Sequence, residues 1–445
     1  MSRVGNAFGA SHMRNGSVAA ARRWLPATFG QRPGQLRRPV TLRVGTVVRV
    51  GAVLVAALVP PILAAIFWSS LRTWQPLGFP GLVETSDPGV YFRSSSWVVG
   101  QGTLYVNVPS EYPLLANLFF ALVRLVSGAL NTQPTALLSF EVTWVTCGWW
   151  MWLAVLFLLW RNAPRRAIWL WLNPAALYFS LYRFDVYLVA GTLLCLLAAR
   201  DGRIRTAALL LGATVALKGF AILFVPAFAL WVWQNKGRRE AAIATALAVG
   251  PMAASLALIF VLSGLTAMLY PFRFQAVRTP DGDTSTWDTI IPFGIGAKIA
   301  RHIPLLPFVL EVGSALVAAV ARPRTFQQLL RAYLIAVGGF LTFSAFYSAQ
   351  FVLWLVAPVA LSDSLAILVA TVAIAWITPL FYPVFFNIPH TRLEFRIPIF
   401  LITVLRTAIF ALVLIPARYV AGWTQSFRAS RVRRGLARAP ESHAP

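Results

Sequence analysis

Long apolar runs alternate with short polar segments along the whole chain. Hydrophobic residues make up 58% of the 445 residues, and charged residues make up only 12%. Soluble domains are less apolar than this, and runs of about twenty apolar residues are long enough to cross a hydrocarbon core as helices. The pattern therefore predicts an all-α, polytopic membrane protein.

Basic residues set the expected orientation of these helices. The formal net charge is +25, and the cations gather in two tails and in short loops instead of on one face. Cytoplasmic loops carry such an excess of Lys and Arg. We expect a disordered basic cytoplasmic tail at 1–48, a transmembrane domain at 49–422 and a second basic cytoplasmic tail at 423–445. The tails suit contact with anionic lipid, and we expect no nucleic-acid partner.

Four short basic loops within the chain are expected on the cytoplasmic side, and the predicted topology is built from them. They lie at 161–166, 200–205, 235–240 and 322–331. A span at 112–130 would put the first of them outside, and Arg124 would then lie in the middle of that span. We therefore expect 112–130 to form an amphipathic helix in the outer membrane interface.

The remaining apolar runs complete a count of about twelve spans with both termini inside. The spans are expected at 51–71, 137–160, 241–263, 307–321, 332–347, 348–361, 365–385 and 397–419, with two short out-and-back pairs at 167–199 and 206–233. The legs of these pairs barely cover a hydrocarbon core. Their turns, near 182–185 and 218–219, are therefore expected below the outer surface, in a wet cavity.

Ionisable residues concentrate on the side predicted to be extracytoplasmic. A few carboxylates facing several cations above a lipid phase suit a substrate whose phosphate or pyrophosphate lies near the membrane surface. The residues on that side are Asp87, Glu111, Arg183, Asp185, Lys218, Arg273, Arg278, Asp283 and His302. The sequence has no GxxxxGK[ST], no HExxH and no His/Cys cluster, so we expect no metal and no cofactor.

The polar stretch 84–115 and three later motifs resemble a known family. The stretch contains Asp87, Tyr91 and the run Glu111-Tyr112-Pro113-Leu114-Leu115. It is similar to the first outer loop of the polyprenyl-phosphate-sugar-dependent glycosyltransferases of the GT-C superfamily, particularly glycosyltransferase family 87. The later motifs follow in the family's order, and they are Arg183-Phe184-Asp185, Ala216-Leu217-Lys218 and Ser348-Ala349-Gln350-Phe351. The chain departs from the family where it has Tyr-Pro-Leu-Leu instead of YPPL and Ser-Ala-Gln-Phe instead of SPQY.

The resemblance implies inverting transfer of a hexose, with mannose expected, from a polyprenyl-phosphate donor to an acceptor hydroxyl. The acceptor would be a glycolipid, a glycan or a secreted product, and the enzyme would act on the outer face of a bacterial plasma membrane. Asp87 matches the family's general base, which accepts the proton of the attacking hydroxyl. Cations must stabilise the leaving phosphate, and Lys218, Arg183 and one of Arg273 or Arg278 are expected to supply them. Further substrate contacts are expected at Glu111, Tyr112, Asp185 and Gln350.

Each of these assignments has a structural alternative. Asp87 precedes Pro88-Gly89 and could cap a turn, Glu111 could cap the helix that follows it, and Arg183 could pair with Asp185. At the level of the whole protein, the alternatives are a transporter or flippase of lipid-linked saccharides and a non-catalytic envelope-assembly protein. If the protein were a transporter, polar residues would be expected in both halves of the membrane.

Overall fold

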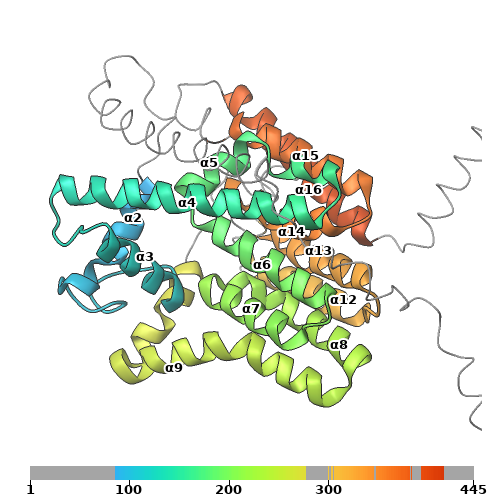
Figure 1. The fold of residues 1–445 in the computed structure, drawn as a ribbon, viewed down its shortest axis with the longest axis horizontal. Helices are drawn as coiled ribbons and strands as arrows, with labels where there is room; N and C mark the ends of the chain where they lie inside the picture. Colours follow the sequence, from blue (N-terminus) through green and yellow to red (C-terminus); the bar gives the residue numbers. More distant parts are fainter. Residues whose placement is uncertain are drawn as a thin grey trace, which may run out of the picture. The chain divides into compact units, whose positions relative to one another are not determined.

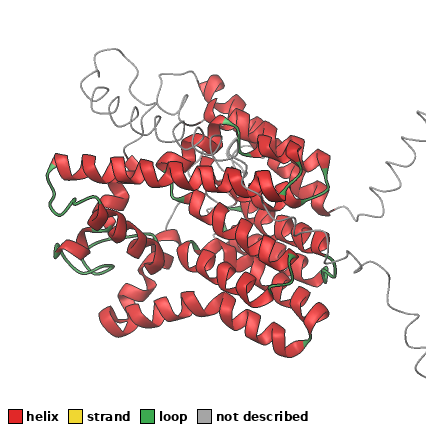
Figure 2. Cartoon of the chain, viewed as in Figure 1, coloured by secondary structure: helices red, strands yellow, loops and turns green. Residues whose placement is uncertain are grey.

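The computed structural model describes residues 86–276, 305–344, 347–380 and 392–414, with single positions at 299, 302, 303 and 382. All of them belong to one compact unit. The described chain is helical and contains no strand (Figure 2), and its one isolated bridge joins Leu104 to Val108. The predicted tails, the first span at 51–71 and Arg278 lie outside the described residues.

Several helices are long and apolar enough to cross a membrane, which confirms a helical membrane protein. Four helices among the described residues meet this condition, namely α4 (Pro134–Asn162), α9 (Arg238–Ala276), α13 (Phe326–Phe343) and α16 (Arg392–Leu414). The pair α5 (Pro174–Tyr182) and α6 (Asp185–Arg200) would be a fifth span, bent by 110°. The total of about twelve spans stays a prediction.

The other helices are short and fill the space between the long ones (Figure 1). The α-helices are α2 (Ser86–Ser94), α3 (Leu114–Val126), α7 (Ile204–Leu217), α8 (Val225–Lys236), α12 (Leu305–Val320), α14 (Val356–Leu361) and α15 (Leu365–Pro379). The 3-10 helices are η3 (Ser96–Val99), η4 (Arg165–Leu170), η5 (Gly219–Phe224) and η6 (Ala349–Leu355). Of these short helices, α7 packs along both α6 and α9.

Local chemistry explains where several helices begin. The Asn173 side chain accepts a hydrogen bond from the Ala176 backbone at 2.9 Å, and Pro174 occupies the first position of α5. Both choices are typical of helix starts. Thr325 and Gln328 form a reciprocal capping box at the start of α13, which satisfies two backbone donors that the helix leaves free.

The two predicted turns lie where the sequence placed them. The chain breaks between α5 and α6 at Arg183, and between α7 and η5 at Lys218. Both residues have extended backbones, with φ −114° and ψ 150° at Arg183 and φ −155° and ψ 113° at Lys218. Each break therefore presents a long cationic side chain between two helix ends.

The end predicted for the span at 241–263 is wrong. The helix α9 continues to Ala276, with a break at Gly264, whose φ of 82° lies in the left-handed region. Glycine adopts this conformation without the steric cost that a Cβ imposes, so the helix changes direction there and resumes. Arg273 consequently lies on a helix and is exposed, instead of lying in an outer loop.

Helix α3 is too short to span a membrane and buries its polar side. Its 13 residues extend over only about 20 Å. Asn117 and Arg124 are buried, whereas Leu118, Leu122 and Leu125 are 45% to 55% exposed. An apolar outer face of this kind suits contact with the acyl boundary of a membrane. Its length agrees with the exclusion of a span at 112–130, while its place in the outer interface stays a prediction.

Arg124 joins α3 to the end of α2 and to the loop that leads into α4. Its guanidinium donates three hydrogen bonds to backbone carbonyls, those of Ala129 (2.9 Å), Phe92 (2.9 Å) and Asn131 (3.1 Å). It also lies 4.1 Å from the centroid of the Phe92 ring. Arg124 is therefore a structural clamp with no exposed surface.

Replacing this clamp is expected to destabilise the protein. Arg124→Ala leaves buried carbonyls without donors, which costs about 3 kcal/mol or more. Arg124→Lys is expected to recover only part of the loss, because one ammonium cannot reproduce a planar fork of donors. Thermal unfolding in detergent measures both variants, with Arg161→Ala, an exposed arginine, as the control. Wild-type stability of Arg124→Ala would contradict the clamp.

The four basic loops lie together at one end of the helices, opposite α2 and α3 (Figure 1). Direct hydrogen bonds link them, from Arg200 to Asn162 (3.0 Å), from Arg205 to Glu240 (2.6 Å) and from Asn235 to the Arg324 carbonyl (3.1 Å). The loops predicted to share one side of the membrane therefore share one end of the fold.

Candidate active site

Asp87 lies in the first turn of α2, where a carboxylate also interacts favourably with the helix dipole. Its Oδ2 forms an ion pair with Arg183 and accepts a hydrogen bond from the Tyr91 hydroxyl at 3.2 Å. Tyr91 is four residues further along and thus on the same face of the helix. Asp87, Pro88 and Gly89 lie at the start of this helix and do not form an isolated turn. The alternative role of Asp87 as the cap of a turn is therefore wrong.

Asp185 begins α6 and is 1% exposed. Its Oδ1 accepts hydrogen bonds from the Lys218 ammonium at 2.9 Å and from the Trp354 indole at 2.7 Å. Arg183 and Asp185, two residues apart, thus each have a partner of opposite charge from a distant segment. The site contains two ion pairs, Asp87 with Arg183 and Asp185 with Lys218.

Aromatic rings surround the two cations. The Lys218 nitrogen lies 5.0 Å to 5.4 Å from the ring centroids of Trp354, Phe351 and Phe184. Arg183 donates a hydrogen bond to the Tyr382 hydroxyl at 3.0 Å, and its guanidinium carbon is 5.4 Å from that ring. Such rings stabilise cations in partly dry surroundings. The Lys218 side chain remains 20% exposed, so a ligand can reach it.

Tyr91 and Tyr112 connect the two acids of the site to Glu111. Their rings meet edge to face with centroids 5.6 Å apart. Burial raises the pKa of both hydroxyls well above the ordinary value, and the negative charges of Glu111 and Asp185 raise the pKa of Tyr112 further. Both phenols therefore stay protonated at neutral pH and act as hydrogen-bond donors.

The predicted site residues divide into those that the fold brings together and those that it does not. Asp87, Tyr112, Arg183, Asp185 and Lys218 form one cluster. Gln350 is buried on η6 beside Phe351 of the same cluster, and the Ser348 hydroxyl donates to its side-chain oxygen. Glu111 borders the cluster through Tyr112 and also lines a separate cavity. Arg273 is exposed on α9.

Three side chains that donate or accept hydrogen bonds in the cluster were missing from the predicted site. Tyr91 could have been found from its spacing of four residues from Asp87, which places both on one helix face. Trp354 follows Gln350 in the same motif. Tyr382 has no local signal, because it reaches Arg183 from a segment about two hundred residues away in sequence.

No group of three His, Cys, Asp or Glu side chains within the described part of the chain is placed to hold a metal ion. The site is defined instead by alternating carboxylates and cations within an aromatic wall. This arrangement can accept a proton at one point and bind an anion at another.

The chain matches no family model, no curated protein and no solved structure. The fold and the site define a helical membrane protein with a partly buried, charge-paired cluster at two helix breaks.

Proposed function

We propose that the protein is a membrane glycosyltransferase that moves a hexose, with mannose expected, from a polyprenyl phosphate to an acceptor hydroxyl. The observation that carries the proposal is the convergence of Asp87, Arg183, Asp185 and Lys218 from three separate segments into one cluster. The site would face the extracytoplasmic side of a bacterial plasma membrane, with both termini in the cytoplasm. The grouping of the basic loops at the other end of the fold supports this orientation.

Asp87 acts as the general base in the proposed reaction. The acceptor oxygen forms a bond to the anomeric carbon while the bond from that carbon to the phosphate oxygen breaks, and configuration inverts. The acceptor proton passes to Asp87. Before substrate binds, Arg183 holds this carboxylate. A donor phosphate would compete for the Arg183 guanidinium, because arginine binds phosphate with paired hydrogen bonds.

Lys218 neutralises the departing phosphate in this mechanism. Its nitrogen lies among three aromatic rings and its side chain is 20% exposed. It would exchange part of its contact with Asp185 for the phosphate. Preorganised cations of this kind stabilise charge that develops in the transition state. No acid needs to protonate the leaving group, because a phosphate monoester is a stable anion.

Transfer and transport of the lipid donor are separable by experiment. Purified protein is reconstituted in vesicles with polyprenyl-phosphate mannose, and both sugar transfer to added acceptors and movement of the donor between leaflets are measured. We expect transfer without accelerated movement between leaflets. Accelerated movement without transfer would support a flippase, and neither signal would support an assembly protein, so both results contradict the proposal.

A further inference from the structure

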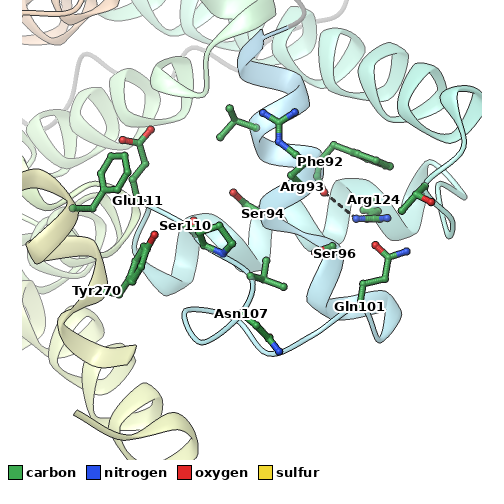
Figure 3. A pocket seen from close by; sticks show the side chains of 15 residues that line it. Phe92, Arg93, Ser94, Ser96, Gln101, Asn107, Ser110, Glu111, Arg124 and Tyr270 are labelled. Carbon is green, nitrogen blue, oxygen red and sulfur yellow. Dashed lines mark hydrogen bonds between the residues drawn. The ribbon is translucent and has the colours of Figure 1, made fainter. Parts of the chain in front are cut away.

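A cavity whose lining does not include the ion-paired residues lies between α2, the loop 101–111 and the end of α9. It has a volume of about 480 Å³, within the range of small-molecule sites. Figure 3 shows that side chains from all three segments surround the same space. The lining side chains that carry hydrogen-bonding groups or a ring are Ser94, Ser96, Gln101, Asn107, Glu111 and Tyr270.

Two cations and one carboxylate line this cavity. Arg93 and Glu111 line it with opposite signs, and the remaining cation, Arg124, is occupied by three backbone carbonyls. A phosphate or carboxylate ligand would find no uncommitted cluster of cations here, such as those that recognise anions. The lining therefore favours an uncharged ligand.

Hydroxyl and amide groups share the lining with aromatic rings. Serine hydroxyls and the amides of Gln101 and Asn107 can donate and accept hydrogen bonds, while Tyr270 and Phe274 add flat apolar surface. A pyranose ring has the complementary chemistry, with hydroxyls around its rim and C–H groups on its faces.

Hydrogen bonds hold the part of the cavity wall that carries Glu111. Asn117, which is fully buried, donates to the Tyr112 carbonyl at 2.8 Å and accepts from the Ser110 hydroxyl at 2.8 Å. The Tyr105 hydroxyl donates to the same carbonyl at 2.6 Å. These bonds fix the strip that carries Glu111, and Glu111 adjoins Tyr112 and thereby the Asp87 cluster. The strip that carries Glu111 is thus a preorganised part of the cavity wall, and it continues directly into Tyr112 of the cluster.

We propose that this cavity binds the acceptor, and that the acceptor presents a short uncharged saccharide there, with Glu111 and Tyr270 as two of its contacts. The identification of this saccharide as the acceptor rests on the proposed function. Its binding to the cavity does not, because binding requires neither donor nor turnover.

The test measures binding without the donor. Wild-type protein in lipid nanodiscs is mixed with methyl hexosides and a methyl dihexoside, and saturation-transfer NMR records contact of the sugar protons with the protein. We expect a saturation-transfer signal for the wild type. This signal should be at least about fivefold weaker in Tyr270→Ala, which removes a contact, and in Ser96→Trp, whose larger side chain fills the cavity. Phe272→Ala is the matched control, since this neighbouring ring on α9 is 52% exposed and does not line the cavity.

Each outcome has a distinct meaning. Absence of a signal from all the neutral sugars, equal signals in all variants, or stronger binding of a hexose phosphate than of the neutral sugars would overturn the cavity proposal. Sugar binding that is lost in Tyr270→Ala supports it, even if the reconstituted enzyme transfers no hexose, in which case only the proposed function fails. If transfer occurs, Tyr270→Ala is also expected to raise the KM for the acceptor and leave that for the donor unchanged.

Discussion

Asp87→Asn is expected to reduce hexose transfer by about 10²- to 10⁴-fold, the usual contribution of a positioned general base. Asparagine has nearly the shape of aspartate and can still accept hydrogen bonds from Tyr91 and Arg183, but it cannot take up the proton of the acceptor. Asp87→Ala is expected to lose transfer as well. The measurement is the initial rate of transfer from polyprenyl-phosphate mannose in vesicles with equal amounts of folded protein.

The control for this variant is Asp201→Asn. Asp201 is also paired with arginine, at 3.1 Å from Arg203, but it lies in a basic loop at the opposite end of the fold. Its substitution should leave the rate unchanged. Normal transfer by both Asp87 variants would refute the assignment of the base, whereas a loss of folded protein in Asp87→Asn would point to a structural ion pair.

Lys218→Gln is expected to cost about 3 to 5 kcal/mol of stability, because it leaves the Asp185 carboxylate charged and buried without its cation. The double variant Asp185→Asn/Lys218→Gln removes both charges, keeps an acceptor for the Trp354 indole, and should return the unfolding midpoint close to that of the wild type. The rate of hexose transfer from the donor should still be at least about a hundredfold lower in the double variant than in the wild type, since the cation for the phosphate is missing.

This pair of variants separates stability from activity. A double variant that is stable and fully active would show that the ion pair is only structural. A matched comparison is Arg205→Gln, which breaks an ion pair of similar length, 2.6 Å to Glu240, at the exposed end of the fold. Arg205→Gln is expected to leave both the unfolding midpoint and the rate of hexose transfer unchanged, because solvent screens the charges of exposed ion pairs.

The helix breaks at Arg183 and Lys218 were predictable because they depend on local sequence. Two basic loops on one side enclose an apolar stretch that is too short for two full spans, so the chain must turn near its polar residues. The continuation of α9 past Gly264 was not predictable in the same way. Glycine permits either a loop or a kink, and the apolar residues that follow are compatible with both.

The sequence by itself determined that the chain is a helical membrane protein, where its polar turns lie and which residue types are available for chemistry. Hydropathy, charge and helix propensity are properties of neighbouring residues, so they can be derived from the order of the chain. Only the tertiary structure decided that Arg183 pairs with Asp87 while Asp185 pairs with Lys218 and Trp354. Those partners come from helices far apart in sequence, and the packing of the helices selects among several cations of equal charge.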